Sequence, residues 1–362
     1  MEKINSSIPG TVLSTHNGNL LTSSGIMSLD PLLGGGLPVG TVVLVEEDFR
    51  GLYSKILLKY FLAEGLVSKH STLIASQDVN PAKILKELPA VIESDPEPDI
   101  KQEGQAITDK MKIAFRYQNL PTSTAAPRSK HIGHHFDLSR NISFSNVDKS
   151  DIDFWTGEKL STGYSSFINP AYSDLLKTIR NKIKKGKFFL KDNPEKKSIL
   201  RIGIHSLGSA MWLPSRSSIS CLNENCQDLY MFLFYLRALV RSAHAVAFVT
   251  IPAYLYEEKI LERCIHSSDI AIKLDSFTGT ELEKNQSLKD YHGFFYLTKL
   301  AAINSLASKN SGSIEYVFKL RRKKFSISVL HLPPDIETKG DQMDSNPMLG
   351  CCGGSNKSLL EF

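Results

Sequence analysis

The sequence has no long uninterrupted hydrophobic run. The longest apolar stretch, LYMFLFYLRALV at 229–240, is interrupted by Arg237 and is shorter than the roughly 20 residues of a membrane-spanning helix. Residues 1–20 are polar and contain no apolar core of the kind found in secretory signals. We therefore expect no membrane association, and we interpret 229–240 as part of a buried helix.

Cysteine is also scarce, with five among 362 residues. Cys221 and Cys226 are close in sequence, but no second Cys/His pair follows at the spacing of a zinc site. The segment HIGHHF at 131–136 is rich in histidine, but only Asp137 lies beside it as a carboxylate ligand. We expect no metal site and reduced thiols, as in a protein of the cytoplasm and the nucleus.

Neither sign of charge dominates the composition. Lys and Arg number 43 against 38 Asp and Glu, so the net charge is +5 and the isoelectric point is near 8.7. This mildly basic balance permits an acidic partner such as nucleic acid without requiring one. At 41% hydrophobic residues, the chain can bury a sizeable core.

Strand and helix patterns alternate through most of the chain. Near-continuous apolar strands that alternate with helices predict an α/β fold, with a mostly parallel sheet covered by helices on both faces. The predicted strands are 41–46, 71–78, 199–207, 245–252 and 269–277, and the predicted helices after the second strand are 80–88, 171–191, 226–242 and 256–266.

The helix after the first strand is amphipathic. Its expected buried stripe consists of Leu57, Leu58, Phe61 and Leu62, and its expected solvent-facing residues are Lys55, Lys59 and Glu64. Near the C-terminus, alternating apolar residues on both sides of RRKK at 321–324 predict an antiparallel hairpin. Its facing residues are Tyr316, Phe318 and Leu320 on one strand and Phe325, Ile327 and Val329 on the other.

Loss of periodicity sets the expected domain limits. Residues 1–22 are predicted to be a disordered N-terminal tail, and 23–334 a single domain. The domain contains a polar, proline-broken insertion at about 93–163, which we expect to be partly disordered because it lacks the apolar residues for a core. Residues 335–362 are predicted to be a disordered C-terminal tail.

The turn after the first strand lacks most residues of a phosphate-binding loop. A working loop reads G-x-x-x-x-G-K-[ST] between a strand and a helix. In that register the two glycines fall on Glu46 and Gly51, the lysine on Leu52 and the hydroxyl residue on Tyr53, so Gly51 alone agrees. Like charges about 4 Å apart repel by about 1 kcal/mol even in water, and the run EED at 46–48 would repel a triphosphate. We expect no bound nucleotide.

The strand at 199–204 likewise lacks the aspartate that supports magnesium in phosphate-loop enzymes. His205 stands in its place. A lone histidine does not replace that carboxylate, so we expect a hydrogen-bonded structural residue. The sequence therefore predicts neither a catalytic residue nor a cofactor.

A family resemblance becomes visible in SGIMSLDPLLGGGLPVGTVVLVEE, at 24–47. The Ser-Leu-Asp, Leu-Leu-Gly-Gly-Gly and Gly-then-strand pattern resembles the segment before the phosphate loop of RecA-like ATPases such as RecA, RadA and KaiC. The closing Glu pair, followed by YSKILLKYFLAEGL and later by RIGIHSLGSAMW, narrows the match. The chain resembles the Elongator complex protein 4 family, RecA-like subunits without a working phosphate loop, over about 23–90 and 155–330.

This resemblance implies a role in an assembly. Family members form a heterohexameric ring with Elongator complex proteins 5 and 6. The ring attaches to the larger Elongator complex, which modifies the wobble uridine of certain transfer RNAs. The resemblance also implies that the ring binds tRNA and hydrolyses ATP, whereas the radical and acetyl-transfer chemistry belongs to another subunit. The expected function is that of a non-catalytic RecA-like subunit.

Two alternatives compete with this interpretation. The first is a divergent RecA-like ATPase with nucleotide at a subunit interface. The second is a relative of the DNA recombinases, against which Leu52 counts because a strand-exchange motor needs lysine there. In the favoured interpretation, the strand–turn–helix at 41–61 frames a subunit interface at which its carboxylates face water or basic partners.

Two basic clusters are candidate RNA contacts, because Lys and Arg bind phosphates without sequence specificity. The candidates are Lys182, Lys184, Lys185 and Lys187 in the first cluster and Arg321, Arg322, Lys323 and Lys324 in the second. A solvated helix face explains the first cluster equally well. Phe188 and Phe189 beside it could stack on bases, but we expect them in the core.

Overall fold

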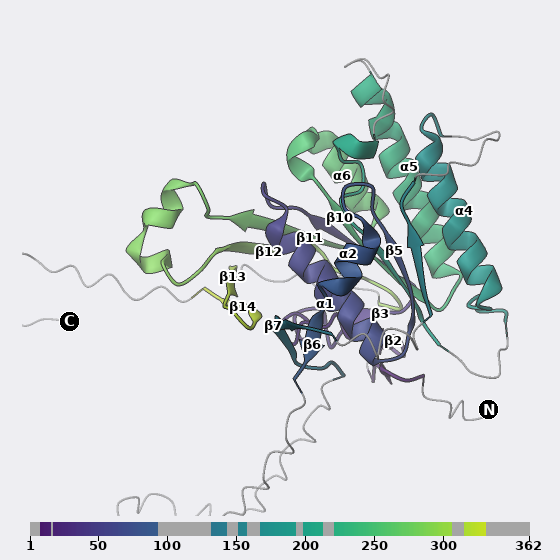
Figure 1. Ribbon diagram of the computed structural model, residues 1–362, viewed down its shortest axis with the longest axis horizontal. Helices are drawn as coiled ribbons and strands as arrows, with labels where there is room; N and C mark the ends of the chain where they lie inside the picture. The colour runs from purple at the N-terminus through teal and green to yellow at the C-terminus, as the bar shows by residue number, and fades with distance from the viewer. Residues whose placement is uncertain are drawn as a thin grey trace, which may run out of the picture. The chain divides into compact units, whose positions relative to one another are not determined.

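The computed structural model describes residues 8–15, 17–92, 132–142, 151–157, 167–192, 198–212, 221–305 and 315–330. A nine-stranded mixed sheet forms the centre of this part of the chain, with the strand order β14-β13-β12-β11-β4-β10-β9-β5-β8 (Figure 1). Its parallel strands are β4 (Val42–Glu46), β5 (Ser71–Ala75), β8 (Ile152–Trp155), β9 (Leu200–Ile204), β10 (Ala245–Ile251) and β11 (Ile270–Ser276). Its antiparallel strands are β12 (Gly293–Lys299), β13 (Tyr316–Leu320) and β14 (Phe325–Val329).

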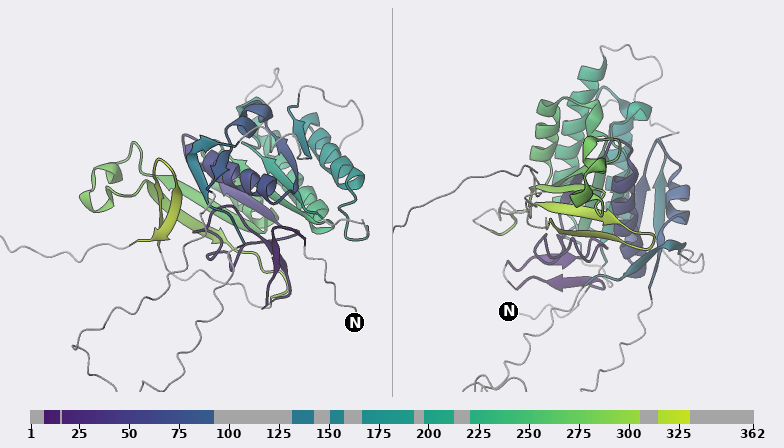
Figure 2. Two further views of the ribbon diagram at one scale, coloured as in Figure 1. Left: turned by 60° about the horizontal axis from the view of Figure 1, so that its bottom comes forward. Right: turned by 90° about the vertical axis from the view of Figure 1, so that its left-hand side faces the viewer.

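Helices cover both faces of this sheet. The helices are α1 (Leu52–Val67), α2 (Pro81–Lys86), α4 (Pro170–Lys185), α5 (Cys221–Arg241) and α6 (Glu258–Ser267). On one face, Leu57 and Phe61 of α1 pack in a core with Val43 and Phe248 of the strands. On the other face, α4, α5 and α6 form a second core with the alternate strand residues (Figures 1 and 2). The α/β prediction, with helices on both faces and an antiparallel end, is confirmed.

The C-terminal hairpin has the predicted register. Tyr316 lies opposite Val329, Phe318 opposite Ile327, and Leu320 opposite Phe325. The shorter elements are the 3-10 helices Ala210–Trp212, Ala253–Leu255, Glu281–Lys284 and Gln286–Leu288.

The predicted N-terminal tail is partly folded, so that prediction is wrong for 8–15 and 17–22. Strands β1 (Thr11–Leu13) and β2 (Leu20–Thr22) form a small antiparallel sheet with β3 (Leu37–Pro38). Ile8 and Leu21 are buried. Two short strands contain too few residues to show a period, and contacts to distant parts of the chain hold them. Residues 1–7 lie outside the described part.

The predicted insertion contributes strands as well. Strand β7 (Phe136–Asn141) pairs with β6 (Pro89–Val91), and β8 extends the central sheet in parallel beside β5. The backbone N–H of Thr72 donates to the carbonyl of Asp151 at 2.9 Å, which fixes this added edge. A four-residue strand carries no readable period, so the sequence did not indicate it. The insertion residues 93–131, 143–150 and 158–163 and the C-terminal 335–362 lie outside the described residues.

Candidate functional site

The candidate site lies where the parallel strands end. Strand β4 leads into Glu46, Glu47 and Asp48, and β9 leads into His205 and Ser206. Because the carboxyl ends of parallel strands share one edge, ligands of open α/β sheets bind there. This edge is therefore the place to test the phosphate-loop expectation.

A carboxylate of the chain itself occupies the N-terminus of α1. Asp48 Oδ1 accepts hydrogen bonds from the backbone N–H groups of Tyr53 (3.0 Å) and Ser54 (3.3 Å), and its Oδ2 accepts one from Leu52 (3.2 Å). The preceding turn is closed by Gly51, whose φ of 60° is a left-handed conformation that glycine adopts without strain. Helix N-termini bind anions through these N–H groups. Here Asp48 is that anion.

Glu47 is buried beside two hydroxyl groups. Its Oε1 accepts hydrogen bonds from Thr250 Oγ1 at 2.6 Å and from Ser206 Oγ at 2.9 Å. Burial raises the pKa of Glu47 to about 7; the two hydroxyls lower it in part, and the charges of Asp78 and Asp48 raise it further. The carboxyl group is therefore close to half protonated near neutral pH.

The three carboxylates do not face water, so that part of the expectation is wrong. Glu46, Glu47 and Asp48 are 5%, 7% and 2% exposed. Burial raises the pKa of Glu46, and the charge of Lys273, which lies opposite it on β11, lowers the pKa in part. Internal hydrogen bonds stabilise Glu47 and Asp48, so those two need no basic partner to remain in place.

His205 has the structural role that the sequence indicates. Its ring Nδ1 lies 3.3 Å from Ser76 Oγ, and the residue is buried. Burial lowers the pKa of His205 to about 4, and the charges of Lys55 and Lys59 lower it as well. The ring is neutral at pH 7 and supplies no carboxylate for magnesium. Within the described residues, no group of three His, Cys, Asp or Glu side chains is arranged to hold a metal ion.

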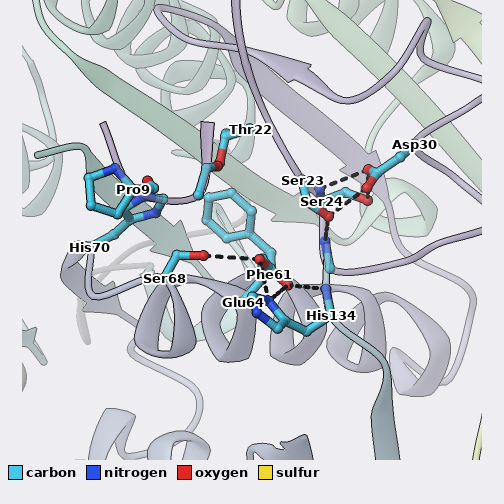
Figure 3. Close-up of polar contacts among 12 residues, drawn as sticks. Pro9, Thr22, Ser23, Ser24, Asp30, Phe61, Glu64, Ser68, His70 and His134 are labelled. Atoms are coloured by element: carbon cyan, nitrogen blue, oxygen red, sulfur yellow. Dashed lines mark hydrogen bonds and ion pairs between the residues drawn. The ribbon is translucent and has the colours of Figure 1, made fainter. Parts of the chain in front are cut away.

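Glu64 of α1 is fully buried, which corrects the expectation that it faces solvent. Its carboxylate accepts hydrogen bonds from Ser68 Oγ (3.0 Å) and from the backbone N–H of His134 (3.0 Å), and it lies 3.0 Å from His134 Nδ1 (Figure 3). Burial raises the pKa of Glu64, but hydrogen bonds from His134 and the charge of Arg201 lower it by more. This contact attaches the segment before β7 to α1.

Arg201 of β9 lies at the centre of the same region and is fully buried. Its guanidinium donates to Thr22 Oγ1 (2.7 Å), the Ser23 carbonyl (2.9 Å) and the Phe61 carbonyl (2.9 Å). A Cβ atom at Gly65 would lie 2.6 Å from Arg201 Cδ, so only glycine leaves room for this side chain. Arg201 thus joins the small N-terminal sheet to α1 and to the central sheet.

The basic candidates lie at opposite ends of the nine-stranded order. Lys182 is buried, and its Nζ pairs with Asp151 (2.6 Å) and Asp153 (2.9 Å), so its assignment as an RNA contact is corrected. The exposed members of the α4 cluster are Lys184, Lys185 and Lys187. The exposed members of the other cluster, on the turn between β13 and β14, are Arg321, Arg322, Lys323 and Lys324. Phe188 is buried and Phe189 partly buried, so Phe188 belongs to the core.

Comparisons with known proteins now decide the family. Residues 4–362 match the family model described as PAXNEB protein. Elongator complex protein 4 of Danio rerio is 41% identical over 97% of this chain and 92% of its own length. The Homo sapiens protein of that name is 40% identical over 98% and 89%, and the Drosophila melanogaster protein 30% identical over 98% and 97%.

The chain belongs to the Elongator complex protein 4 family.

The resemblance stated from the sequence is thereby confirmed. Among solved structures, a KaiC-like protein from the archaeon Pyrococcus horikoshii OT3 is similar, with a TM-score of 0.48 and 14% identity over 85% of this chain and 98% of that chain. The fold of this member of the Elongator complex protein 4 family is α/β, with a nine-stranded mixed sheet between two layers of helices. None of its described helices is long and apolar enough to cross a membrane.

Apolar side chains are exposed around the buried carboxylates of this family member. They follow the carboxyl ends of β4, β9 and β10, and they are Phe49 (79% exposed), Leu52 (51%), Met211 (64%), Tyr254 (53%) and Leu255 (47%). The rings of Phe49 and Tyr254 are in contact, with centroids 5.4 Å apart. We call these five residues the apolar rim. The sequence did not indicate it, because its members come from separate segments of the chain.

Asp48→Ala should destabilise the fold by about 1–2 kcal/mol, the effect of removing a helix cap. Three backbone N–H groups at the start of α1 would lose their acceptor. Asp48→Asn keeps one carbonyl acceptor and should lose less. Urea denaturation of both variants measures the difference, and an Ala variant as stable as the wild type would contradict the capping role.

Proposed function

We propose that this chain is a non-catalytic, RecA-like subunit of the Elongator complex. In this role it assembles with Elongator complex proteins 5 and 6 in a heterohexameric ring, binds tRNA and supports modification of the wobble uridine, in the cytoplasm and the nucleus. The relatives that carry the name Elongator complex protein 4 support membership of the complex. One structural observation supports a non-catalytic role, namely the Asp48 carboxylate at the α1 N-terminus.

Nucleotide binding at this edge is unfavourable for a physical reason. A phosphate group would have to displace Asp48 from its three N–H donors and would then lie near the charges of Glu46 and Glu47. Leu52 and Tyr53 provide neither the ammonium group nor the small hydroxyl that hold phosphate and magnesium in a working loop.

The apolar rim supports assembly. Large exposed aromatic and aliphatic side chains, when they gather on one surface, are typical of protein–protein interfaces. The apolar rim supplies such side chains next to Glu47 and Asp48, whose carboxylates are stabilised by hydrogen bonds within the chain. We therefore expect one ring contact at this edge.

ATP binding by the isolated chain tests the non-catalytic role. We expect no binding by the wild type at cellular ATP concentrations, measured by calorimetry. The matched control combines Glu46→Gly, Leu52→Lys and Tyr53→Thr with Asp48→Ser, which vacates the helix terminus. Tight ATP binding by the wild type would contradict the non-catalytic role and favour a divergent ATPase, and if Asp48→Ser left that affinity unchanged, the nucleotide would bind away from the α1 terminus.

The mass of the complex after co-expression with Elongator complex proteins 5 and 6 tests assembly. We expect six chains, and we expect Phe49→Ser with Tyr254→Ser to reduce the yield of the ring. A salt titration of tRNA binding then tests the RNA role, because phosphate contacts weaken steeply with added salt. A chain that remains a monomer in the presence of both partners and hydrolyses ATP would contradict the proposal.

A further inference from the structure

Two segments that are far apart in sequence, β7 and the basic β13–β14 turn, lie side by side. The backbone N–H of Leu138 in β7 donates to the carbonyl of Lys323 in the β13–β14 turn at 2.9 Å. Both segments also pack on Tyr60 of α1. The ring centroids of Phe136 and Tyr60 are 5.9 Å apart, and the Phe325 N–H donates to Tyr60 Oη at 3.1 Å. The insertion and the hairpin turn therefore form one surface.

The exposed charge of this surface is positive. Arg140 of β7 is exposed, as are the four residues of the turn, Arg321 to Lys324. Within the described residues, no carboxylate forms an ion pair with any of these five side chains. The nearby Asp290 pairs with Lys319 at 3.3 Å. These cations are therefore available to an external anion.

The carboxylate of Asp137 interacts electrostatically with charged side chains of both segments. Its carboxylate is already engaged by the Ser139 hydroxyl (2.6 Å) and N–H (2.8 Å). The Ser139 hydrogen bonds lower the pKa of Asp137, and the charges of Lys323 and Arg140 lower it as well. Arg140 therefore belongs to the same charge cluster as the turn.

We propose that β7 and the β13–β14 turn form a single binding surface for the RNA phosphate backbone, with Arg140 as a phosphate-contacting residue. The inference rests on the RNA role proposed above and states which surface of the chain contacts the RNA. Phosphate contacts need cations held in position and no base readout, and the arginine fork can bind a phosphate through two parallel hydrogen bonds. Arg140 lay within the expected insertion, where no pattern singled it out.

The chemistry of the surface favours RNA over an acidic protein. The outer half of β7 exposes Ser139, Arg140 and Asn141, which are all polar. The large apolar residues beside them, Phe136 and Phe325, are buried. A protein interface needs an apolar centre, whereas a phosphate backbone needs none.

His134 is the positioning residue for this surface. It lies two residues before β7, and its backbone and ring contact the buried Glu64 of α1 (Figure 3). This contact fixes the start of β7 relative to the helix that also supports Phe325. The alignment of Arg140 with the turn therefore depends on the contact between His134 and Glu64.

Fluorescence anisotropy with tRNA, using the full chain in complex with Elongator complex proteins 5 and 6, tests the contact. Arg140→Gln should weaken binding about fivefold and should lower the slope of log K against log salt by about one, the effect of one lost phosphate contact. Gln at all four turn positions should weaken binding more. Lys259→Gln on α6, also exposed, is the charge-matched control and should change neither quantity.

The rival surface is tested in the same titration. If Lys184→Gln with Lys185→Gln removes the binding and Arg140→Gln has no effect, RNA binds at α4, and the inference is overturned while the proposed function survives. The same holds if the surface binds an acidic protein and Arg140→Gln leaves RNA affinity unchanged. If the wild-type complex binds no tRNA, the proposed RNA role itself fails.

A double variant separates positioning from direct contact. His134→Ala should weaken tRNA binding while it keeps all five cations, and it should have little further effect when Arg140 is already Gln. Equal effects in the two backgrounds would show that His134 does not act through Arg140, and would overturn the positioning role. Circular dichroism of each variant confirms that the fold is retained.

Discussion

Replacing Arg201 with methionine should destabilise the folded chain by about 3–5 kcal/mol, because several buried acceptors would lose a charged hydrogen-bond donor. The guanidinium is fully buried and donates to Thr22, Ser23 and Phe61. Methionine fills much of the space, but it removes these donors from two carbonyls and removes one nearby positive charge from Glu64. Chemical denaturation measures the loss in the free energy of unfolding.

The matched control is the double variant Arg201→Met with Glu64→Gln. Arg201→Met leaves the charge of Glu64 less well stabilised, and Glu64→Gln removes that charge. The double variant should therefore lose less free energy of unfolding than the sum of the two single variants. Hydrogen exchange should show that β2, which contains Thr22, loses protection before β4 does. A single Arg201→Met variant with wild-type stability and wild-type exchange would contradict the central role of this residue.

Glu47→Gln should stabilise the fold at pH 8 by up to about 3 kcal/mol, because a rise of the pKa from 4.5 to about 7 corresponds to that free energy. The folded state binds this proton more tightly than the unfolded state does. The stability contributed by the protonated group is therefore complete below pH 4.5 and is lost as the pH rises through about 7. Gln cannot ionise, and its carbonyl still accepts from Ser206 and Thr250.

Denaturation curves at pH 5 and pH 8 measure this effect. The advantage of Glu47→Gln should be small at pH 5 and should develop between these two values. Glu258→Gln, at an exposed position on α6, is the matched control and should not show the same pH dependence. Parallel stability profiles for the wild type and Glu47→Gln would rule out the raised pKa.

Hydrophobic periodicity predicts many of the buried positions of an element that is long enough to repeat. The stripe Leu57, Leu58, Phe61 and Leu62 of α1 is an example, since all four residues are fully buried. Local capping is equally readable, since Asn80 Oδ1 accepts from the Ala82 N–H at 2.9 Å, as Asn followed by Pro indicates. These signals depend only on neighbours in the sequence.

Partners that are distant in sequence cannot be read in this way. Glu64 and Lys182 have the composition of solvent-facing helix positions, and both are buried because carboxylates or donors from other segments satisfy them. Strand β8 is too short to show a pattern and exists because β5 supplies its hydrogen bonds. In each case the missing information is the identity of a tertiary partner.

The candidate site was predicted in the same partial way. Its lack of phosphate-loop residues at Glu46, Leu52 and Tyr53 is visible in the sequence. The group that occupies the helix terminus is not, because a capping side chain usually comes from the residue directly before the helix. Gly51 takes that position here, so Asp48 caps from three residues further back.

The position of Asp48 also bears on whether the conformation of this protein can respond to the cellular ratio of ATP to ADP. A loop that receives its anion from a ligand alternates between loaded and empty forms, and its helix terminus follows the supply of that ligand. Here the anion is part of the polypeptide and arrives when the chain folds. In the proposed role we therefore expect the start of α1 to stay the same at every ratio of ATP to ADP, so that a response of the ring to that ratio would originate in another subunit or at another surface.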